Sequence, residues 1–186
     1  MTKKILSSDV IAVTEIWLER AVIGLNLCPF VKAVHVKRQI RYVVSEATTP
    51  EALADELVRE LEFLAEANPA TVDTTLLIHP HVLKDFLDFN DFLEVADGIV
   101  EELELDGILQ VASFHPQFQF ENTEPDDITN YTNRAPYPTL HLLREDSVER
   151  AVGAFPGELE IASANIVTLE TLGHDGWHAL KSPTAQ

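Results

Sequence analysis

The sequence contains few basic residues, one cysteine and seven glycines, and each shortage excludes a class of protein. The chain has 13 lysine and arginine residues against 31 aspartate and glutamate residues, which gives a formal net charge of −18. Such an acidic surface repels phosphate backbones and anionic lipids, so we expect no nucleic-acid partner and no membrane partner. Cys28 is the single cysteine and cannot form a disulfide within the chain, which agrees with a reducing compartment.

Long apolar runs are also missing from the sequence. No stretch approaches the roughly 20 apolar residues that are needed to span a bilayer. The first residues do not predict a signal peptide, because Ile5 and Leu6 are followed at once by Ser7, Ser8 and Asp9. We therefore expect a soluble, cytoplasmic protein. The few glycines form no phosphate-binding loop, and the sequence has neither a Gly-x-Ser-x-Gly motif nor a Cys-x-x-Cys pair.

The periodicity of apolar residues predicts one α/β (or α+β) domain over residues 1–186. Apolar residues make up 46% of the chain, which is enough to form the core of such a domain. Helices are predicted at about 8–25, 49–68, 82–105 (broken near 88–90), 147–155 and 160–173. Strands are predicted at about 34–44, 75–78, 108–114 and 139–143. These elements indicate a mixed sheet of about four strands with five or so helices and a long irregular loop at 116–138.

Two of the predicted strands end in the same dipeptide, His-Pro, at His79-Pro80 and His115-Pro116. If these strands are parallel neighbours, both imidazoles leave the sheet at the edge where open α/β sheets place their ligands. His81 follows two residues after His79 and can face the same side of an extended chain. The pattern therefore makes His79 and His115 candidate catalytic residues.

These histidines allow three interpretations. His79, His81 and His115 could hold Zn, Mn or Fe as the divalent metal, with one carboxylate completing the shell, from Glu121, Glu124, Asp126 or Asp127. Without a metal, the same imidazoles could act as general acid and base near neutral pH. In the structural alternative, they only hydrogen-bond to the main chain at the strand ends.

The irregular loop supplies the candidate substrate-binding residues. Arg134 is a third candidate catalytic residue that could bind a carboxylate or phosphate, although it could also be tied to neighbouring acids. Asn130, Asn133 and Tyr131 would orient the substrate, and His141 either joins the site or faces solvent. These residues indicate a small anionic molecule as the ligand.

Cys28 is predicted to be structural rather than nucleophilic. It follows the first predicted helix, where the negative end of the helix dipole raises a thiol pKa. Its apolar neighbours Leu27, Pro29 and Phe30 act in the same direction. The C-terminal Trp177 is predicted to pack back on the core.

Several phrases together make the chain resemble the bacterial family labelled domain of unknown function 1415, from about Trp17 to Trp177. They are Gly24-Leu25-Asn26-Leu27-Cys28-Pro29-Phe30, Phe114-His115-Pro116, Asn130-Tyr131-Thr132-Asn133-Arg134, Pro136-Tyr137-Pro138 and His141-Leu142-Leu143-Arg144-Glu145. The resemblance implies a small bacterial cytosolic protein made of this domain alone. It implies no activity or cofactor, but five positions fall inside its motif phrases: Cys28, His115, Asn130, Asn133 and Arg134.

Two functions remain open from the sequence. The first is an enzyme of hydrolase or lyase type that acts on a small anionic metabolite at a histidine-centred site beneath the 116–138 loop. The second is a non-catalytic binding protein, whose loop docks a partner or a second copy in a homo-oligomer. In that case the interface anchors would be aromatic: Phe118, Phe120, Tyr131 and Tyr137.

Overall fold

The computed structural model describes residues 6–153 and 158–181, and it contains a four-stranded mixed sheet with the strand order β1-β2-β4-β3. The strands are β1 (Ile40–Val44), β2 (Thr74–Ile78), β3 (Leu109–Phe114) and β4 (Thr139–Arg144). β1 is parallel to β2, whereas β4 is antiparallel to both of its neighbours, β2 and β3. The predicted α/β fold with about four strands is therefore confirmed.

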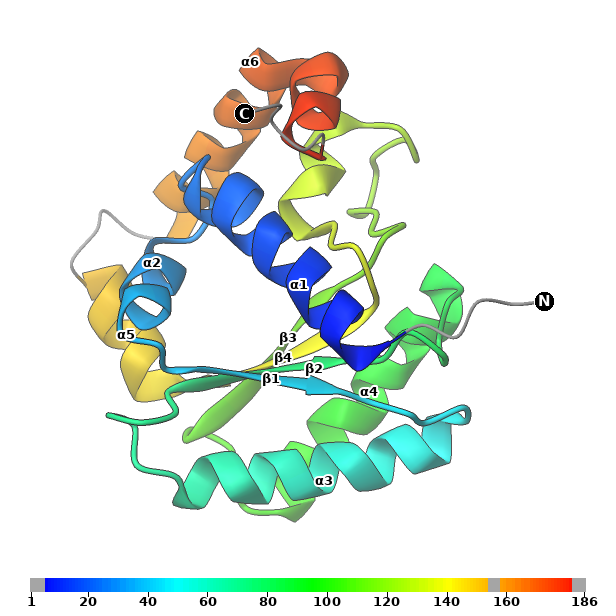
Figure 1. The fold of residues 1–186 in the computed structure, drawn as a ribbon, viewed down its shortest axis with the longest axis vertical. Coiled ribbons are helices and arrows are strands. Elements are labelled where there is room, and N and C mark those ends of the chain that lie inside the picture. Colours follow the sequence, from blue (N-terminus) through cyan, green and yellow to red (C-terminus); the bar gives the residue numbers. More distant parts are fainter. Residues whose placement is uncertain (1–5, 154–157, 182–186) are drawn as a thin grey trace.

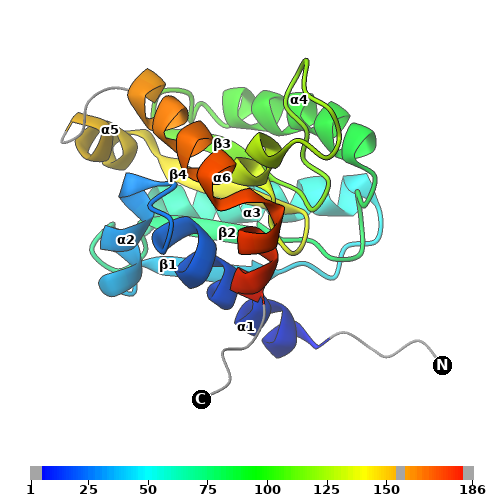
Figure 2. The same cartoon turned by 90° about the horizontal axis from the view of Figure 1, so that it is seen from above.

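Helices cover both faces of the sheet (Figure 1). α3 (Pro50–Glu66) and α4 (Phe86–Glu102) lie against one face. The other face is covered by five elements: α1 (Ser7–Trp17), the π-helix η1 (Leu18–Ile23), α2 (Pro29–Val36), α5 (Glu145–Gly153) and α6 (Glu158–Lys181). The view in Figure 2 shows these helices stacked over the strands. Among the described helices, none combines the length and apolar character needed to cross a membrane.

α3 forms where its sequence signals predict it. The Thr49 hydroxyl accepts a hydrogen bond from the main-chain N–H of Ala52, and Pro50 occupies the first turn, where its missing N–H costs nothing. Leucines at helical spacing then face the sheet and α4, and each is 0% exposed: Leu53, Leu57, Leu61 and Leu64. Full burial of each such side chain stabilises the fold by roughly 1.5–3 kcal/mol.

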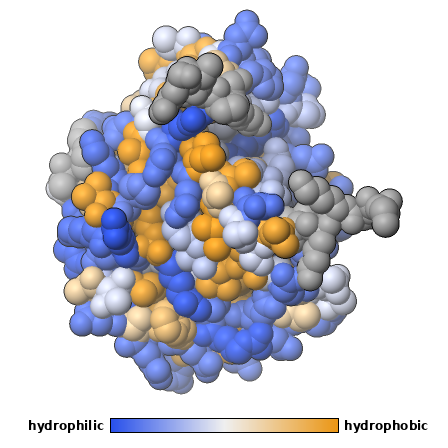
Figure 3. All heavy atoms as spheres, viewed as in Figure 1, coloured by the Kyte–Doolittle hydropathy of each residue, from blue (hydrophilic) through white to orange (hydrophobic). Residues whose placement is uncertain are grey.

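The opposite face is less uniformly packed. Figure 3 shows hydrophobic residues gathered in the middle of the view, where α1 lies in Figure 1. On α1, Val13 and Ile16 are 41% and 45% exposed. Val10 and Trp17 of the same helix are buried.

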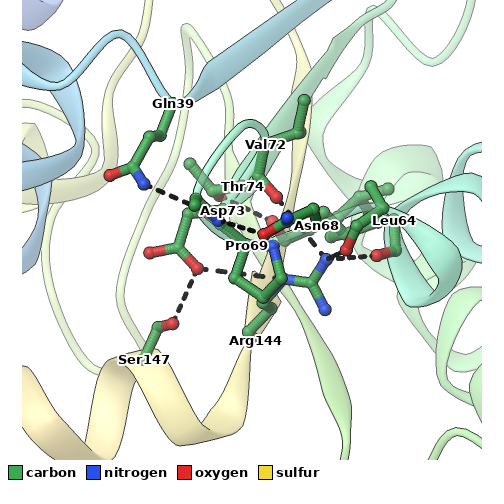
Figure 4. A network of polar contacts seen from close by, with 12 residues as sticks. Gln39, Leu64, Asn68, Pro69, Val72, Asp73, Thr74, Arg144 and Ser147 are labelled. Carbon is green, nitrogen blue, oxygen red and sulfur yellow. Dashed lines mark hydrogen bonds and ion pairs between the residues drawn. The ribbon is translucent and has the colours of Figure 1, made fainter.

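An arginine-centred network closes the end of the sheet opposite the His-Pro dipeptides (Figure 4). Arg144 donates hydrogen bonds to the main-chain oxygens of Leu64 and Ala67, and its Nε lies 3.8 Å from Asp73 Oδ1. Ser147 donates to the same carboxylate at 2.7 Å. The network joins the end of α3 to β2, β4 and α5, so its role is structural.

Two predicted boundaries were wrong. The segment 34–39 is not part of a strand, because Pro29 starts α2, whose buried residues Phe30, Val31 and Val34 have helical spacing. α4 is not broken at 88–90, since Phe89 faces the core within a continuous helix. The predicted end at Gly173 coincides with a break inside α6: Gly173 has a non-helical φ of 63°, and a second helical stretch follows it to Lys181.

The loop at 116–138 is less irregular than predicted. It contains the 3-10 helix η2 (Ile128–Asn133), which Asp127 caps by accepting a hydrogen bond from the main-chain N–H of Thr129 at 2.8 Å. The predicted helix end at Pro156 lies outside the described residues.

Candidate functional site

His79 and His115 leave the same edge of the sheet, but not from neighbouring strands. β2 and β3 run in the same direction with β4 between them. The main-chain N–H of His79 donates to Pro138 O at 3.0 Å, and that of His115 donates to Asn133 O at 3.1 Å. The condition that the two strands are parallel neighbours is therefore met only in part: they run in the same direction, but they are not adjacent.

Both imidazoles are sealed in packing around Phe89. Their ring centroids lie 5.6 Å (His79) and 5.1 Å (His115) from the Phe89 ring, and both residues are 0% exposed. Burial lowers the pKa of His79 to about 4 and also lowers the pKa of His115. Both rings are therefore neutral at pH 7.

Ring nitrogens of both histidines form hydrogen bonds with main-chain groups. His79 Nδ1 lies 3.1 Å from Val82 O, and His115 Nε2 lies 3.3 Å from Leu83 O. A carbonyl can only accept, so each of these nitrogens carries the proton. His115 Nδ1 then accepts from the N–H of Gln117 at 3.0 Å. This geometry matches the structural alternative, in which the histidines hold the chain at the strand ends.

The predicted three-histidine metal group is not formed in the described parts of the chain. Within residues 6–153 and 158–181, no three His, Cys, Asp or Glu side chains lie close enough together to hold a metal ion. His81 is half-buried, apart from the packed pair. Glu121, Glu124 and Asp126 are exposed, and Asp127 caps η2.

Asn130 organises the loop from within. Its side chain is 0% exposed, and its Oδ1 accepts hydrogen bonds from the Phe120 N–H at 2.9 Å and the Thr123 hydroxyl at 2.8 Å. Its Nδ2 donates to Glu124 O at 2.8 Å. Asn133 Nδ2 lies 3.4 Å from Ser113 O, a long contact with β3. Both asparagine side chains thus make contacts within the protein.

Arg134 is tied to carbonyls rather than to neighbouring acids. Its Nε donates to Phe118 O at 3.1 Å, and its Nη2 donates to Pro125 O. The guanidinium carbon lies 4.3 Å from the centre of the Tyr131 ring, a cation–π contact. Arg134 therefore has a defined position beside Tyr131.

Arg134 and Tyr131 line a cavity of about 360 Å³, which we call the loop cavity. It lies between α1, α6 and the 116–138 segment. Its lining consists of Val13, Ile16, Trp17, Arg20, Ala21, Pro116, Tyr131, Arg134, Ala135, Pro136, Trp177 and Leu180. This lining has two guanidinium groups and no carboxylate among the described residues.

Arg20, Trp17 and Trp177 were not predicted as site residues. Arg20 Nη1 donates to Leu180 O at 3.2 Å, which links η1 to α6 across the cavity. Trp177 is 3% exposed and its ring lies 5.0 Å from that of Tyr131, so its predicted packing on the core is confirmed. The spacing of Val13, Trp17, Arg20 and Ala21 on one helical face was the available signal, but only the fold shows that α6 and the loop lie opposite it.

A second cavity, of about 230 Å³, lies directly on the sheet, and we call it the sheet cavity. All four strands contribute to its floor, through Ile40, Thr74, Leu76, Ala112, Phe114, His141 and Leu143. The covering helices and the Leu27–Val31 segment supply its walls: Trp17, Leu18, Val22, Leu27, Cys28, Pro29, Phe30, Val31, Val148, Ala151 and Ile161. His141 is 8% exposed, so it does not face bulk solvent.

Cys28 lies in the wall of the sheet cavity, and one of the two arguments for its weak reactivity was wrong. It precedes the first turn of α2 rather than following a helix C-terminus, and the main-chain N–H groups of Val31 and Phe30 lower its thiol pKa. Burial is the larger effect and raises that pKa overall. The thiol is therefore protonated at neutral pH, as predicted.

Fold and cavities together define a small α/β protein in which the described residues enclose the loop cavity and the sheet cavity on one face of the sheet. The family model described as "Protein of unknown function (DUF1415)" matches residues 9–179, and the chain belongs to this family. Comparison with curated proteins and with solved structures gave no significant match.

Proposed function

We propose that the protein binds a small anionic molecule with an aromatic or apolar body in the loop cavity. The observation that supports this proposal is the charge of the lining: two arginines and no carboxylate among the described residues, in a chain with 31 acidic and 13 basic residues. A lining with the chain's own ratio of acidic to basic residues would contain more acids than bases. The lining therefore departs from the rest of the molecule in the direction that favours an anion.

The chemistry of the cavity favours a carboxylate on an aromatic ring. Guanidinium groups bind carboxylates through paired hydrogen bonds, and Arg134 is already held by two carbonyls and the Tyr131 ring. Its immobilisation lowers the entropy cost of binding. Trp17, Tyr131 and Trp177 offer apolar surface for the body of the ligand.

Two buried donors also favour an acceptor in this region. The indole N–H groups of Trp17 and Trp177 have no hydrogen-bond partner among the described residues. A buried donor without a partner costs roughly 1–3 kcal/mol. An anionic ligand that reaches either group would recover part of that cost.

The geometry favours binding over the two other functions expected from the sequence. His79 and His115 do not line the loop cavity, so the proposal assigns them no catalytic role. The loop aromatics mostly pack inward, with Phe118 on Phe86 and Tyr131 on Trp177, at centroid distances of 5.3 and 5.0 Å. Phe120 is 38% exposed, which is little surface for docking a partner.

Intrinsic fluorescence tests the proposal directly, because both tryptophans of the chain line the loop cavity. We expect phenylacetate to change the emission saturably, with a Kd of about 1 mM or below, and to bind more weakly as salt is raised. Phenylacetamide is the matched neutral probe and should bind at least about fivefold more weakly, a difference of about 1 kcal/mol.

Arg134→Gln should remove the preference for the anion, and Arg41→Gln is its matched control. Arg41 pairs with Glu60 at 2.8 Å and does not line the cavity, so its replacement should leave phenylacetate binding unchanged. Equal affinity for the two probes, or no saturable change with either of them, would contradict the proposal.

A further inference from the structure

The sheet cavity contains a basic nitrogen whose protonation state the surrounding hydrogen bonds determine. His141 lies on β4, opposite Leu76 of β2 and Ala112 of β3. Its Nε2 is 2.8 Å from the Thr74 hydroxyl, and the same hydroxyl is 2.6 Å from Leu142 O. Three groups thus form one short chain of hydrogen bonds along the sheet.

The direction of this chain follows from the chemistry of its last member. Leu142 O can only accept, so it takes the single proton of the Thr74 hydroxyl. The hydroxyl oxygen must then accept from His141, which places the ring proton on Nε2. In the neutral ring, Nδ1 is consequently a hydrogen-bond acceptor with a free lone pair.

Nδ1 has no hydrogen-bond partner among the described residues. It is also not one of the described polar atoms that are both fully buried and without a partner, so it keeps some accessible surface. His141 is more than nine-tenths buried and lines the sheet cavity. The remaining access to its ring is therefore through the cavity. Burial lowers the pKa of His141 to about 4, so the ring stays neutral at physiological pH.

The rest of the cavity selects against charge. Its lining contains no Asp, Glu, Lys or Arg among the described residues, and its polar side-chain atoms come only from Thr74, Cys28, His141 and the indole N–H of Trp17. Thr74 already uses its hydroxyl proton, and the Cys28 thiol is protonated. A charged ligand would lose its hydration without compensation there.

We propose that the sheet cavity is a second binding site, for a small uncharged apolar molecule whose single hydroxyl or N–H donates a hydrogen bond to Nδ1 of His141. A volume of about 230 Å³ exceeds the roughly 150 Å³ of an apolar protein cavity that accepts benzene, so one substituted ring fits. Trp17 lines both cavities and separates this site from the loop cavity. Because the loop cavity is lined by two arginines and the sheet cavity by no charged residue among those described, we expect the first to bind an anion and the second an uncharged molecule.

Phenol and toluene are matched probes for this site, because they have nearly the same shape and only phenol has a donor. Binding is followed by NMR of side-chain methyl groups that line the sheet cavity but not the loop cavity, such as those of Val31, Leu76 and Leu143. We expect both probes to shift these methyl signals saturably in the wild-type protein.

His141→Gln is the decisive variant. The Gln Nε2 can still donate to Thr74, as the His Nε2 does, whereas the acceptor at the Nδ1 position is lost. We expect the ratio of phenol affinity to toluene affinity to fall about fivefold or more in this variant, equivalent to one hydrogen bond of about 1 kcal/mol. Comparing this ratio between the variant and the wild-type protein cancels the difference in hydration between the two probes. It also cancels any change in the cavity that affects both probes equally.

Ala112→Leu provides a second, independent variant, because it fills the sheet cavity without touching His141's hydrogen bond to Thr74. It should abolish the methyl shifts with both probes and leave phenylacetate binding in the loop cavity unchanged. An unchanged phenol-to-toluene ratio in His141→Gln would overturn the proposal, as would the absence of saturable shifts in the wild-type protein. Neither result bears on the loop cavity, whose test uses a different probe and signal.

Discussion

The two faces of the sheet are packed in different ways. On one face, α3 and α4 are both 17 residues long and seal the strands with leucine and phenylalanine side chains that are 0% exposed. On the other face, five elements cross the same strands and leave the sheet cavity between them. We infer that the first face mainly stabilises the fold and that the second provides the space for ligands.

The largest expected effect is a difference between two leucine-to-alanine variants. Leu57→Ala opens a cavity where packing is complete, and we expect it to lower the free energy of unfolding by about 3–5 kcal/mol. Leu143→Ala only widens the existing sheet cavity, so we expect a smaller loss of about 2 kcal/mol.

Urea denaturation of both variants at one pH measures this difference. Equal losses would show that the second face is packed as completely as the first in solution.

The next effect is a loss of stability in acid. The pKa of His79 and that of His141 are lowered to about 4 in the folded protein, below the usual value of 6.5. Between these values the unfolded chain binds more protons than the folded one, so stability is full above pH 6.5 and falls as the pH drops toward 4. Each histidine should contribute a loss of about 2–3 kcal/mol across this window.

His141→Gln isolates the contribution of the second face, since glutamine does not titrate. The free energy of unfolding, measured by urea denaturation at several pH values between 7 and about 4.5, should fall less steeply in this variant than in the wild-type protein. Identical slopes would contradict the neutral, buried state of His141.

The smallest effect compares two alanine-to-leucine variants. Ala96 is 0% exposed within the packed face, so Ala96→Leu should destabilise the protein by about 1–3 kcal/mol through overpacking. Ala112 borders the sheet cavity, where a larger side chain finds room, so Ala112→Leu should change stability by less than about 1 kcal/mol. Thermal unfolding followed by circular dichroism distinguishes the two, and a large loss in Ala112→Leu would mean that the cavity does not accept extra atoms.

Much of the fold was predictable because its signals are local. The leucine stripe of α3 and the continuous apolar run of β2 identified two central elements, and the motif phrases identified the family. The segment 34–36 was misassigned because its apolar residues, Val34 and Val36, fit the alternation of the strand that follows, whereas Phe30, Val31 and Val34 have helical spacing. Pro29 at the start of α2 decides between them only once the helix packs against α5 and the sheet.

The candidate site was less predictable because it combines distant segments. Arg134 and Tyr131 could be named from the loop sequence, but their partners Trp17, Arg20 and Trp177 lie more than 40 residues away along the chain. The two His-Pro dipeptides suggested a catalytic edge. Packing against Phe89 instead surrounds both rings, and the main-chain carbonyls of Val82 and Leu83 bind them.

By itself, the sequence determined the class of fold, the family and the acidic character of the surface, since these follow from composition, periodicity and short motifs. Only the tertiary structure decided which polar groups meet in a cavity. The reason is physical, because the order of the strands places β4 between β2 and β3. In this arrangement His141 lies on the floor of the sheet cavity, whereas His79 and His115 are enclosed by packed side chains. No local pattern encodes that choice, because it depends on which helix covers each face of the sheet.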